Sequence, residues 1–322
     1  MQALRVENGG LRLRDVSVPK VETSNEALVR VLKSGICNTD LEIARGYAHF
    51  QGTIGHEFCG IVERADDAPE LIGKRIVGEI NVGCGECVFC KSDDARHCPR
   101  RTVLGIKGRD GAHAEFLSLP ARNLFEVPDE VSNDEAVFVE PLAAAFGITE
   151  QIEIFPDTRV AIIGDGKLGN LCAQSLALKS ENVFLIGKHA EKLALLSESN
   201  VETTLLENAE KLSKTFDVAV EASGAASGFA TALSLLKPRG KLVLKSTFQG
   251  ATNPEMWRVV VDEISVVGSR CGRFAPAIGL LADKKIRVEN LVSKEFSLRD
   301  AVRAMRRAEA GGVMKVLLAG GN

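Results

Sequence analysis

The sequence predicts an α/β protein in which a β-rich part of the chain is followed by a doubly wound parallel sheet. Three observations predict this class. Short β-branched runs broken by Gly, Pro and Asn fill the chain up to about Ala145. From Phe146 onward, apolar strands alternate with helical stretches. A glycine-rich loop joins the first of those strands to the first helix.

The composition is that of an ordinary globular protein. The chain has 322 residues, 45% hydrophobic and 26% charged, with a net charge of -3. That charge argues against nucleic-acid binding, which normally needs a basic surface. No apolar run approaches the roughly 20 residues that span a bilayer, and the charged start lacks the apolar region of a secretory signal. We therefore expect a cytoplasmic protein with no nucleic-acid or membrane partner, in a reducing compartment.

The first part of the chain, residues 1–145, has the pattern of antiparallel strands. Its β-branched runs include EALVRVLKSG, GIVERA, GKRIVGEI and AEFLSLPARNLFEVP. Short strands separated by turn residues indicate a small barrel or sandwich.

Four of the eight cysteines lie close together in the loop 84–98. Cys84, Cys87, Cys90 and Cys98 form a Cys-x2-Cys-x2-Cys-x7-Cys run. In a reducing compartment such thiolates can share one zinc ion, in a closed tetrahedral and therefore structural site. Disulfides are disfavoured by the compartment. An iron–sulfur cluster is disfavoured by spacing, because the bacterial ferredoxin run has three residues before its last cysteine.

The second part predicts a parallel sheet. Its strands are TRVAIIG, NVFLIG, VETTLL, FDVAVEASG, GKLVLKS and EISVVGS, and its helices are KLGNLCAQSLALKS, AEKLALLSES, NAEKLSK and SGFATALSLLK. After Cys271 two more helices, APAIGLLADKK and LRDAVRAMRRAEAG, and the strand-like VENLVSKEFS and VMKVLLAG return to the style of the first part. We expect three ranges: a catalytic domain over 1–145, a cofactor domain over 146–271, and a return to the first domain over 272–322.

The glycine loop GDGKLG fits a dinucleotide-binding fingerprint. Gly164 permits the tight turn, Gly166 lets backbone approach a pyrophosphate, and Gly169 lets helix and strand pack closely. The N–H groups at the helix start then bind the phosphates. Lys167 and Leu168 complete the set of loop residues expected at the cofactor. Asp165 and Lys167 fill variable places, and we expect no special role for them.

The end of the second strand favours NADP over NAD. An NAD site usually has an acid there to bind the ribose hydroxyls, but this chain has Gly187. Lys188 offers a cation to a 2′-phosphate, His189 a donor, and Lys192 a further charge. Cations at a helix N-terminus are unfavourable by themselves, so a bound phosphate would explain them.

Several motifs together resemble the zinc-dependent alcohol dehydrogenases of the medium-chain dehydrogenase/reductase superfamily, over essentially the whole chain. The motifs are GICNTD (35–40), GHEFCGIV (55–62), CGECVFCKSDDARHC (84–98), DGAHAEF (110–116), VEPLAAA (139–145) and GDGKLG (164–169). The resemblance implies a GroES-like catalytic domain, a Rossmann cofactor domain and an active site between them. The polyol, sugar and threonine-dehydrogenase-like members are closest in style.

The resemblance also assigns the catalytic zinc ligands. Taken alone, Cys37 and His56 would more often be a core thiol and a structural histidine. By resemblance they are ligands together with Glu140, which is followed by Pro141 as in the polyol branch. Glu57 is a neighbouring group whose ligation in some states is left open, and Asp40 orients the ligand histidine.

The implied chemistry is hydride transfer at two zinc ions per chain, one catalytic and one structural. Zinc acts as a Lewis acid on an alcohol or carbonyl, and hydride passes to or from NADP(H). Thr39 takes the proton first. Some members of the family have a relay histidine at the position of Glu42. In having no histidine there, this chain is more similar to the sugar-dehydrogenase members, and the later steps of the proton relay are left open.

Further residues at strand ends are expected near the cofactor. These are Ser223, Gly224, Lys245, Ser246, Ser269 and Arg270, with Thr247 beside them. The resemblance implies a homodimer or homotetramer, often paired near EISVVGS, acting on a small-molecule alcohol or carbonyl. The alternatives are an NAD-linked polyol or sugar dehydrogenase, a non-enzymatic dinucleotide-binding protein on the same fold, and a zinc-free reductase of the superfamily, which would lack both zinc motifs.

Overall fold

The computed structural model describes residues 1–21, 25–246 and 256–320, and these form two compact units. Unit 1 comprises Met1–Glu140 and Phe274–Asn322, and unit 2 comprises Pro141–Arg273. Unit 1 is therefore made from two separate stretches of the chain, whereas unit 2 is continuous. The division into domains at 1–145, 146–271 and 272–322 remains a prediction.

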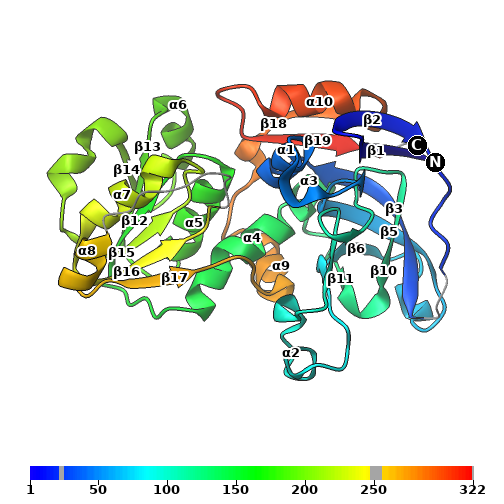
Figure 1. Ribbon diagram of the computed structural model, residues 1–322, viewed down its shortest axis with the longest axis horizontal. Coiled ribbons are helices and arrows are strands. Elements are labelled where there is room, and N and C mark those ends of the chain that lie inside the picture. The colour runs from blue at the N-terminus through cyan, green and yellow to red at the C-terminus, as the bar shows by residue number, and fades with distance from the viewer. Residues whose placement is uncertain (22–24, 247–255, 321–322) are drawn as a thin grey trace. The chain divides into compact units, whose positions relative to one another are not determined.

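Unit 1 is built around a seven-stranded sheet (Figure 1). Its strands are β3 (Glu26–Gly35), β5 (Glu57–Ala65), β6 (Arg75–Gly78), β10 (Phe116–Pro120), β11 (Leu124–Glu126), β18 (Val292–Ser297) and β19 (Lys315–Ala319). The order is β11-β6-β5-β3-β19-β18, with β10 also paired to β3. In β3 the side chains of Ala27, Val29 and Val31 are buried and those between them are partly exposed, as in a strand with one face on the core.

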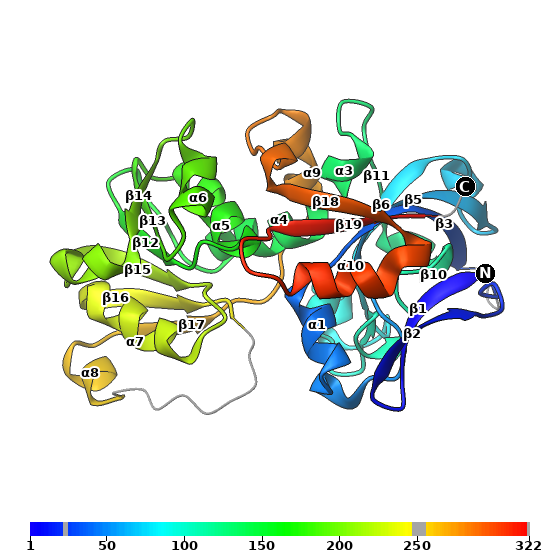
Figure 2. The same ribbon diagram turned by 90° about the horizontal axis from the view of Figure 1, so that it is seen from above.

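Two three-stranded sheets and several short helices complete unit 1. The sheets contain β1 (Gln2–Glu7), β2 (Gly10–Asp15) and β4 (Gly52–Thr53), and β7 (Asn81–Val82), β8 (Thr102–Leu104) and β9 (Gly108–Arg109). The helices are α1 (Asn38–Ala44), α2 (Val88–Lys91), α3 (Asn133–Ala136), α9 (Phe274–Ala282) and α10 (Ala301–Ala308). Helix α4 (Val139–Phe146) begins in unit 1 and ends in unit 2. Helix α10 packs on β18 and β19, where Ala301, Ala304 and Met305 are buried (Figure 2).

Unit 2 contains a six-stranded, fully parallel sheet in the order β14-β13-β12-β15-β16-β17. The strands are β12 (Arg159–Ile163), β13 (Asn182–Gly187), β14 (Val201–Leu205), β15 (Phe216–Glu221), β16 (Leu236–Leu244) and β17 (Ser265–Gly268). Its helices are α5 (Lys167–Ala177), α6 (Ala190–Leu193), α7 (Ala226–Leu235) and α8 (Met256–Val261). Figure 2 shows α5 and α6 on one face of this sheet and α7 on the other. The predicted doubly wound class is confirmed.

Strand order places the glycine loop at the centre of this sheet. β12 lies between β13 and β15, which is where the order reverses direction. In open α/β sheets ligands bind at the carboxyl ends of the strands at such a reversal. The loop 164–169 follows β12 at that point.

Several segments differ from the sequence-based prediction, and two of them lie in unit 2. The stretch NAEKLSK is not an α-helix: its first five residues end the 3₁₀ helix Leu206–Leu212. The connection between β14 and β15, residues 206–215, is short and is made of tight turns, for which i→i+3 bonding is common. Helix α8 was not predicted, because its sequence MWRVVV has no polar face to give a helical period.

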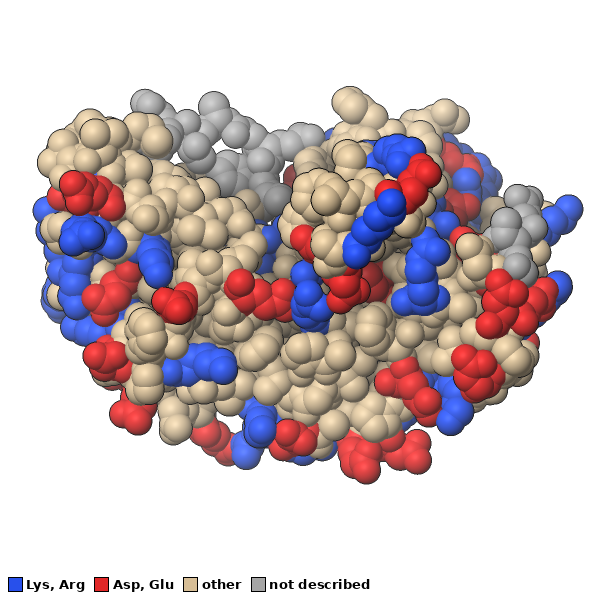
Figure 3. All heavy atoms as spheres, turned by 90° about the horizontal axis from the view of Figure 1, so that it is seen from below, with Lys and Arg blue, Asp and Glu red and all other residues tan. Residues whose placement is uncertain are grey.

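The surface charge agrees with the composition. On the face drawn in Figure 3, basic and acidic side chains are intermixed and no large area carries one sign. No helix of the described residues is long and apolar enough to cross a membrane.

Candidate metal centres and cofactor loop

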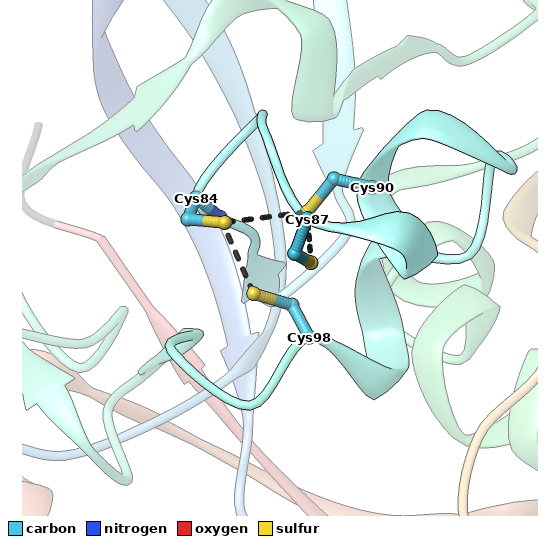
Figure 4. Close-up of side chains that lie close together, drawn as sticks. All are labelled: Cys84, Cys87, Cys90 and Cys98. Carbon is cyan, nitrogen blue, oxygen red and sulfur yellow. Dashed lines mark hydrogen bonds between the residues drawn. The ribbon is translucent and has the colours of Figure 1, made fainter.

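The side chains of the four clustered cysteines converge within one loop (Figure 4). Their sulfur atoms all lie within 4.8 Å of one another. Cys84 and Cys90 sulfurs are 4.0 Å apart, and Cys87 and Cys90 sulfurs are 3.6 Å apart. Tetrahedral zinc with bonds of about 2.3 Å requires sulfur separations of about 3.8 Å, while a disulfide requires about 2.05 Å. The cysteines are unbridged, so the arrangement fits a metal and not disulfides.

Local hydrogen-bond donors stabilise thiolates in this loop. The backbone N–H of Cys84 donates to Cys98 Sγ at 3.4 Å, and the Arg100 guanidinium donates to Cys84 Sγ at 3.3 Å. The N–H groups of Glu86 and Cys87 lower the pKa of Cys84 to about 6. A thiol must lose its proton to bind a metal, so these donors favour ligation.

The second candidate centre is organised around one buried carboxylate, Asp40. Its Oδ2 accepts the backbone N–H of Cys37 at 2.8 Å, and its Oδ1 accepts that of Gly55 at 3.1 Å. The Nδ1 atom of His56 lies 3.3 Å from Oδ1, and Nε2 of His113 lies 3.5 Å from Oδ2. Asp40 thus ties together the start of α1 and the segment before β5.

The charges around Asp40 shift its pKa and that of His56 in opposite directions. Burial alone raises the pKa of Asp40, but His56 and His113 outweigh it and hold the pKa below its usual range. Burial alone lowers the pKa of His56, but Asp40 and Cys37 outweigh it and raise the pKa. The carboxylate therefore stays charged and orients the imidazole, as an outer partner of a metal-binding histidine does.

Cys37, His56 and Glu57 are brought together. Their ligand atoms lie within 4.8 Å of one another, and His56 and Glu57 are 3% and 0% exposed. The Cys37 sulfur is 3.7 Å from Thr39 Oγ1. A thiol, an imidazole and a carboxylate form a donor set that suits zinc.

Glu57 forms a buried ion pair that the sequence analysis missed. Its Oε2 accepts a short hydrogen bond from Lys315 Nζ on β19, and both residues are 0% exposed. The Lys315 ammonium also lies 5.5 Å from the Phe138 ring centroid. Glu57 Oε1 has no hydrogen-bond partner among the described residues, so one carboxylate oxygen is paired and the other is available.

Glu140, the third ligand implied by the resemblance, lies near this group but outside it. Among the described residues, its carboxylate is not within 4.8 Å of both the Cys37 sulfur and the His56 ring nitrogens. Burial raises its pKa to about 7, with His56 and Lys315 acting in the other direction. Of the described residues, none forms a hydrogen bond or ion pair with its carboxylate. The Cys37–His56–Glu57 grouping is thus what the structure shows, and ligation by Glu140 stays a prediction.

Two further polar residues belong to the segments that form the centre or lie beside it. Glu42, at the relay position, bonds Arg45 at 2.7 Å. His113 is fully buried, with Nδ1 2.9 Å from Ser34 Oγ. Neither His113 nor Lys315 stood out in the sequence, although His113 lies inside the motif DGAHAEF.

The glycine loop of unit 2 has the three properties its fingerprint requires. Gly164 has φ +120, and a Cβ there would lie 2.6 Å from Ala222 O. A Cβ on Gly169 would lie 1.8 Å from Gly164 O, which enforces close helix–strand packing. Around Gly166, the N-cap of α5, nothing lies within 4 Å of an ideal Cβ, so the helix start is open to a phosphate group. The loop fits a dinucleotide.

Asp165, for which no special role was expected, has one. Its Oδ2 accepts the backbone N–H groups of Lys188 at 2.6 Å and His189 at 2.7 Å. The His189 ring Nδ1 is 3.0 Å from the same oxygen. The residue is 7% exposed. It therefore connects the glycine loop to the end of β13.

The remaining cofactor candidates fall into two sets. Lys188 and Arg270 are exposed, and Lys192 is partly buried. Ser223 Oγ donates to Glu221 Oε1 at 2.6 Å, and Gly224 N–H donates to Ser246 Oγ at 2.8 Å.

Lys245 differs from these candidates because it is buried. Its ammonium donates to Ala144 O at 2.7 Å, Ser269 Oγ at 3.2 Å and Arg270 O at 3.4 Å. Protein oxygens thus take up the donors of Lys245. Thr247 lies outside the described residues.

Two family models match the chain. Residues 23–129 match the alcohol dehydrogenase GroES-like domain, and residues 168–283 match the zinc-binding dehydrogenase domain. The first covers the Cys37–His56–Glu57 group and the cysteine loop. The second covers most of the parallel sheet.

Curated relatives and solved structures agree with these models. The chain is 25% identical to a probable D-xylulose reductase A of Aspergillus fumigatus, over 96% of this chain and 94% of that protein. It is 28% identical to a sorbitol dehydrogenase of Halalkalibacterium halodurans, over 91% of each. A zinc-binding dehydrogenase of Sinorhizobium meliloti 1021, solved with NADP, superposes with a TM-score of 0.89 at 29% identity, covering 99% of this chain and 98% of that one.

A further solved structure holds the other cofactor. The alcohol dehydrogenase rspB of Escherichia coli CFT073, complexed with NADH, superposes with a TM-score of 0.90 at 25% identity, covering 99% of both chains. The matches confirm the predicted family and the prediction of an oxidoreductase, over the non-enzymatic alternative.

Proposed function

The chain belongs to the zinc-dependent alcohol dehydrogenases of the medium-chain dehydrogenase/reductase superfamily, and from this premise we propose that its substrate is a polyol or a related sugar-like alcohol. The reaction is reversible hydride transfer between the alcohol and NADP(H) or NAD(H). The relatives named as a D-xylulose reductase and a sorbitol dehydrogenase support this substrate class.

The observation that carries the proposal is the convergence of Cys37, His56 and Glu57 around the Asp40 carboxylate. A partly exposed thiol, a buried imidazole and a buried carboxylate, with a second carboxylate that orients the imidazole, suit a metal ion. A bound zinc ion supplies Lewis acidity that lowers the pKa of a hydroxyl or polarises a carbonyl.

The residues of this chain have distinct proposed roles. Cys37, His56 and Glu140 hold the metal. Glu57, fixed by Lys315, places a carboxylate beside them. Thr39, whose hydroxyl is 3.7 Å from the Cys37 sulfur, moves the substrate proton.

Glu140 is proposed as the third ligand over Glu57 because of their partners. The charge of Glu57 is already balanced by the buried cation of Lys315, so a metal ion would gain less from this carboxylate. Glu140 is a partly buried carboxyl whose pKa desolvation raises to about 7, and it has no bonded cation, so a metal would offset the cost of its desolvation.

We propose two zinc ions per chain. The second is held by Cys84, Cys87, Cys90 and Cys98, whose sulfur separations suit a closed tetrahedral site. Closed four-sulfur sites leave no open position for substrate, so this ion is structural.

We propose a preference for NADP(H) over NAD(H), supported by Gly187 in place of the usual acid and by the cations Lys188 and Lys192. The negative charge of the Asp165 carboxylate opposes binding of a 2′-phosphate, so we expect the preference for NADP(H) to be small. Binding of NADP and NADH by similar proteins is consistent with either cofactor.

We propose a homo-oligomer formed through the edge of unit 2. Among the described strands β17 is an edge strand of the parallel sheet. Nearby, Trp257, Val260 and Val261 on α8 are 62%, 75% and 68% exposed. Exposed apolar side chains beside an open strand edge are typical of a subunit interface.

The experiment is a substrate screen combined with metal analysis. Polyols, sugar alcohols and simple alcohols are assayed with NADP and NAD, and zinc is quantified in the wild type and in the Cys37→Ala variant. The proposal expects polyol-dependent reduction of NADP and loss of one of two zinc ions in the variant. Turnover of simple monohydric alcohols alone would contradict the substrate class, and one zinc in both proteins would contradict the two-zinc site.

A further inference from the structure

The end of β13 carries a carboxylate that does not belong to β13. In dinucleotide-binding sheets the acid that binds the adenosine ribose stands at the end of the second strand. That position here is Gly187, which has no side chain. The carboxylate of Asp165, from the glycine loop, lies next to it instead.

The distances show that Asp165 and Gly187 form a matched pair. An ideal Cβ on Gly187 would lie 2.4 Å from Asp165 Cβ and 2.5 Å from Asp165 Oδ2. Both separations are too short for a real side chain, so an acid at 187 and Asp165 exclude each other. In an aspartate the carboxylate oxygens lie about 2.4 Å from their own Cβ, from ordinary bond lengths. Asp165 Oδ2 is therefore as far from the Gly187 position as the oxygen of an acid at 187 would be.

Hydrogen bonds hold the carboxylate at this place. Oδ2 accepts the N–H groups of Lys188 and His189, the two residues that follow β13. Those two N–H groups would otherwise face an incoming anion at the strand end. Asp165 thus takes up both donors and adds a negative charge.

The consequence concerns the group that distinguishes the two cofactors. NADP carries a 2′-phosphate on the ribose where NAD carries a hydroxyl. A carboxylate near a phosphate of about two negative charges opposes it by Coulomb repulsion, worth on the order of tenfold in affinity in a partly solvated site. The cations of Lys188 and Lys192 act in the other direction.

We propose that Asp165 is the residue that sets the discrimination between a 2′-phosphate and a 2′-hydroxyl, replacing the acid absent from β13. This inference rests on the proposed cofactor site at the glycine loop. It adds the determinant, and it explains why Gly187 need not mean strict NADP dependence. The fingerprint's variable position thereby controls cofactor choice.

The test measures binding and needs no turnover. Affinities for 2′,5′-ADP and 5′-AMP are measured by calorimetry, because their ratio isolates the contribution of the 2′-phosphate. The Asp165→Asn variant keeps one oxygen for the two N–H groups and an amide toward His189, and removes only the charge. In this variant the affinity for 2′,5′-ADP, relative to the affinity for 5′-AMP, should rise about tenfold. NADPH and NADH titrations followed by fluorescence should shift in the same direction.

Two further variants locate the effect. Asp157→Asn removes an exposed carboxylate just before β12, at the opposite end of that strand, and should leave the ratio unchanged. The double variant Asp165→Gly/Gly187→Asp returns the acid to β13, since glycine at 165 removes the clashing Cβ. In the double variant the affinity for 2′,5′-ADP relative to 5′-AMP should be equal to the wild-type value or lower.

The outcomes separate this inference from the proposed function. An Asp165→Asn ratio within twofold of wild type, with both nucleotides still bound, overturns the role of Asp165 and leaves the cofactor site intact. A double variant that shifts like Asp165→Asn overturns the replacement of the β13 acid. A wild-type chain that binds neither nucleotide overturns the cofactor site and this inference with it. If Asp165→Asn does not fold, the double variant decides.

Discussion

Lys315 is a fully buried cation whose ammonium meets Glu57 and the face of Phe138. A buried ion pair contributes little net stability compared with apolar residues, but removing one partner leaves an uncompensated charge. The pair therefore fixes the position of Glu57 beside the metal centre more than it stabilises the fold.

Replacing Lys315 by methionine should destabilise the metal-free protein by about 3 kcal/mol, because Glu57 then lies buried without a partner. The double variant Glu57→Gln/Lys315→Met should recover most of that loss, since it removes both charges. Urea denaturation of the two variants measures the free energies of unfolding. A double variant as unstable as Lys315→Met would contradict the ion-pair explanation.

Glu140 makes the metal-free protein sensitive to pH. Its pKa is raised from 4.5 to about 7 by burial, so between these values the folded state holds a proton that the unfolded state has released. Stability contributed at this site is therefore greatest below pH 4.5 and is lost as pH rises to about 7.

The Glu140→Gln variant should remove this loss, and the metal-free variant should be more stable than the wild type at pH 8 by a few kcal/mol at most. Thermal unfolding of EDTA-treated protein at pH 5 and pH 8 measures it. The same variant should lose the catalytic zinc, in contrast to Glu57→Gln. Retention of both zinc ions in Glu140→Gln would show that Glu140 is not a ligand.

For single residues, the sequence predicted those whose partners lie close to them in the chain. The cysteine loop and the glycine loop were predicted from short motifs. Lys315 was missed because its partner Glu57 is far away in sequence and only the pairing of β19 with β3 brings them together. Asp165 was missed because its role depends on a missing side chain at Gly187.

The turn from β12 into α5 depends on three glycines that are not equivalent. Gly169 is constrained by close packing against Gly164 O, whereas Gly166 faces open space with φ -76. We therefore expect Gly169 to be needed for folding and Gly166 to be needed for cofactor binding.

Alanine at these two positions should have different effects. Gly169→Ala should destabilise the protein strongly, because its Cβ would overlap a backbone oxygen. Gly166→Ala should fold with near wild-type stability, yet bind NADPH more weakly because the methyl group stands where the pyrophosphate approaches. Thermal unfolding and fluorescence titration separate the two. Equal loss of stability in both would contradict the distinction.

The loop that holds Cys84–Cys98 contains only α2 and a 3₁₀ turn, so we expect its order to depend on the proposed zinc ion. Cys90→Ser should reduce zinc from two ions to one per chain and make this loop susceptible to proteolysis. Mass spectrometry of metal content and limited trypsin digestion measure these changes. Cys271→Ser is the matched control and should keep both ions.

Element prediction succeeded where hydrophobic periodicity was strong. The continuous apolar runs of β12, β13 and β15 and the amphipathic α10 follow the sequence closely. It failed in Leu206–Leu212, where tertiary limits on connection length decide between α and 3₁₀ geometry.

For the molecule as a whole, the exposed apolar side chains of α8 and β17 predict self-association. Trp257 is the only tryptophan of the chain, so its fluorescence reports on this surface directly. Emission should shift to the red on dilution, as the subunits separate and the indole becomes solvated. A Val260→Glu/Val261→Glu variant should be a monomer by light scattering at concentrations where the wild type is not. A wild type that stays monomeric with constant emission would contradict the proposed interface.

The discontinuity of unit 1 affects how the protein is made. Unit 2 is a continuous stretch, and we expect it to fold on the ribosome as soon as it emerges, because domains generally fold as units during synthesis. Unit 1 has to wait for β18, β19 and Lys315, which are translated some 250 residues after Glu57. Until then the Lys33–Gly35 end of β3 is paired with β5 but lacks its second partner, β19, and Glu57 lacks its cation. A nascent chain stalled before residue 315 would thus expose an incomplete metal centre and an open strand edge to chaperones and proteases.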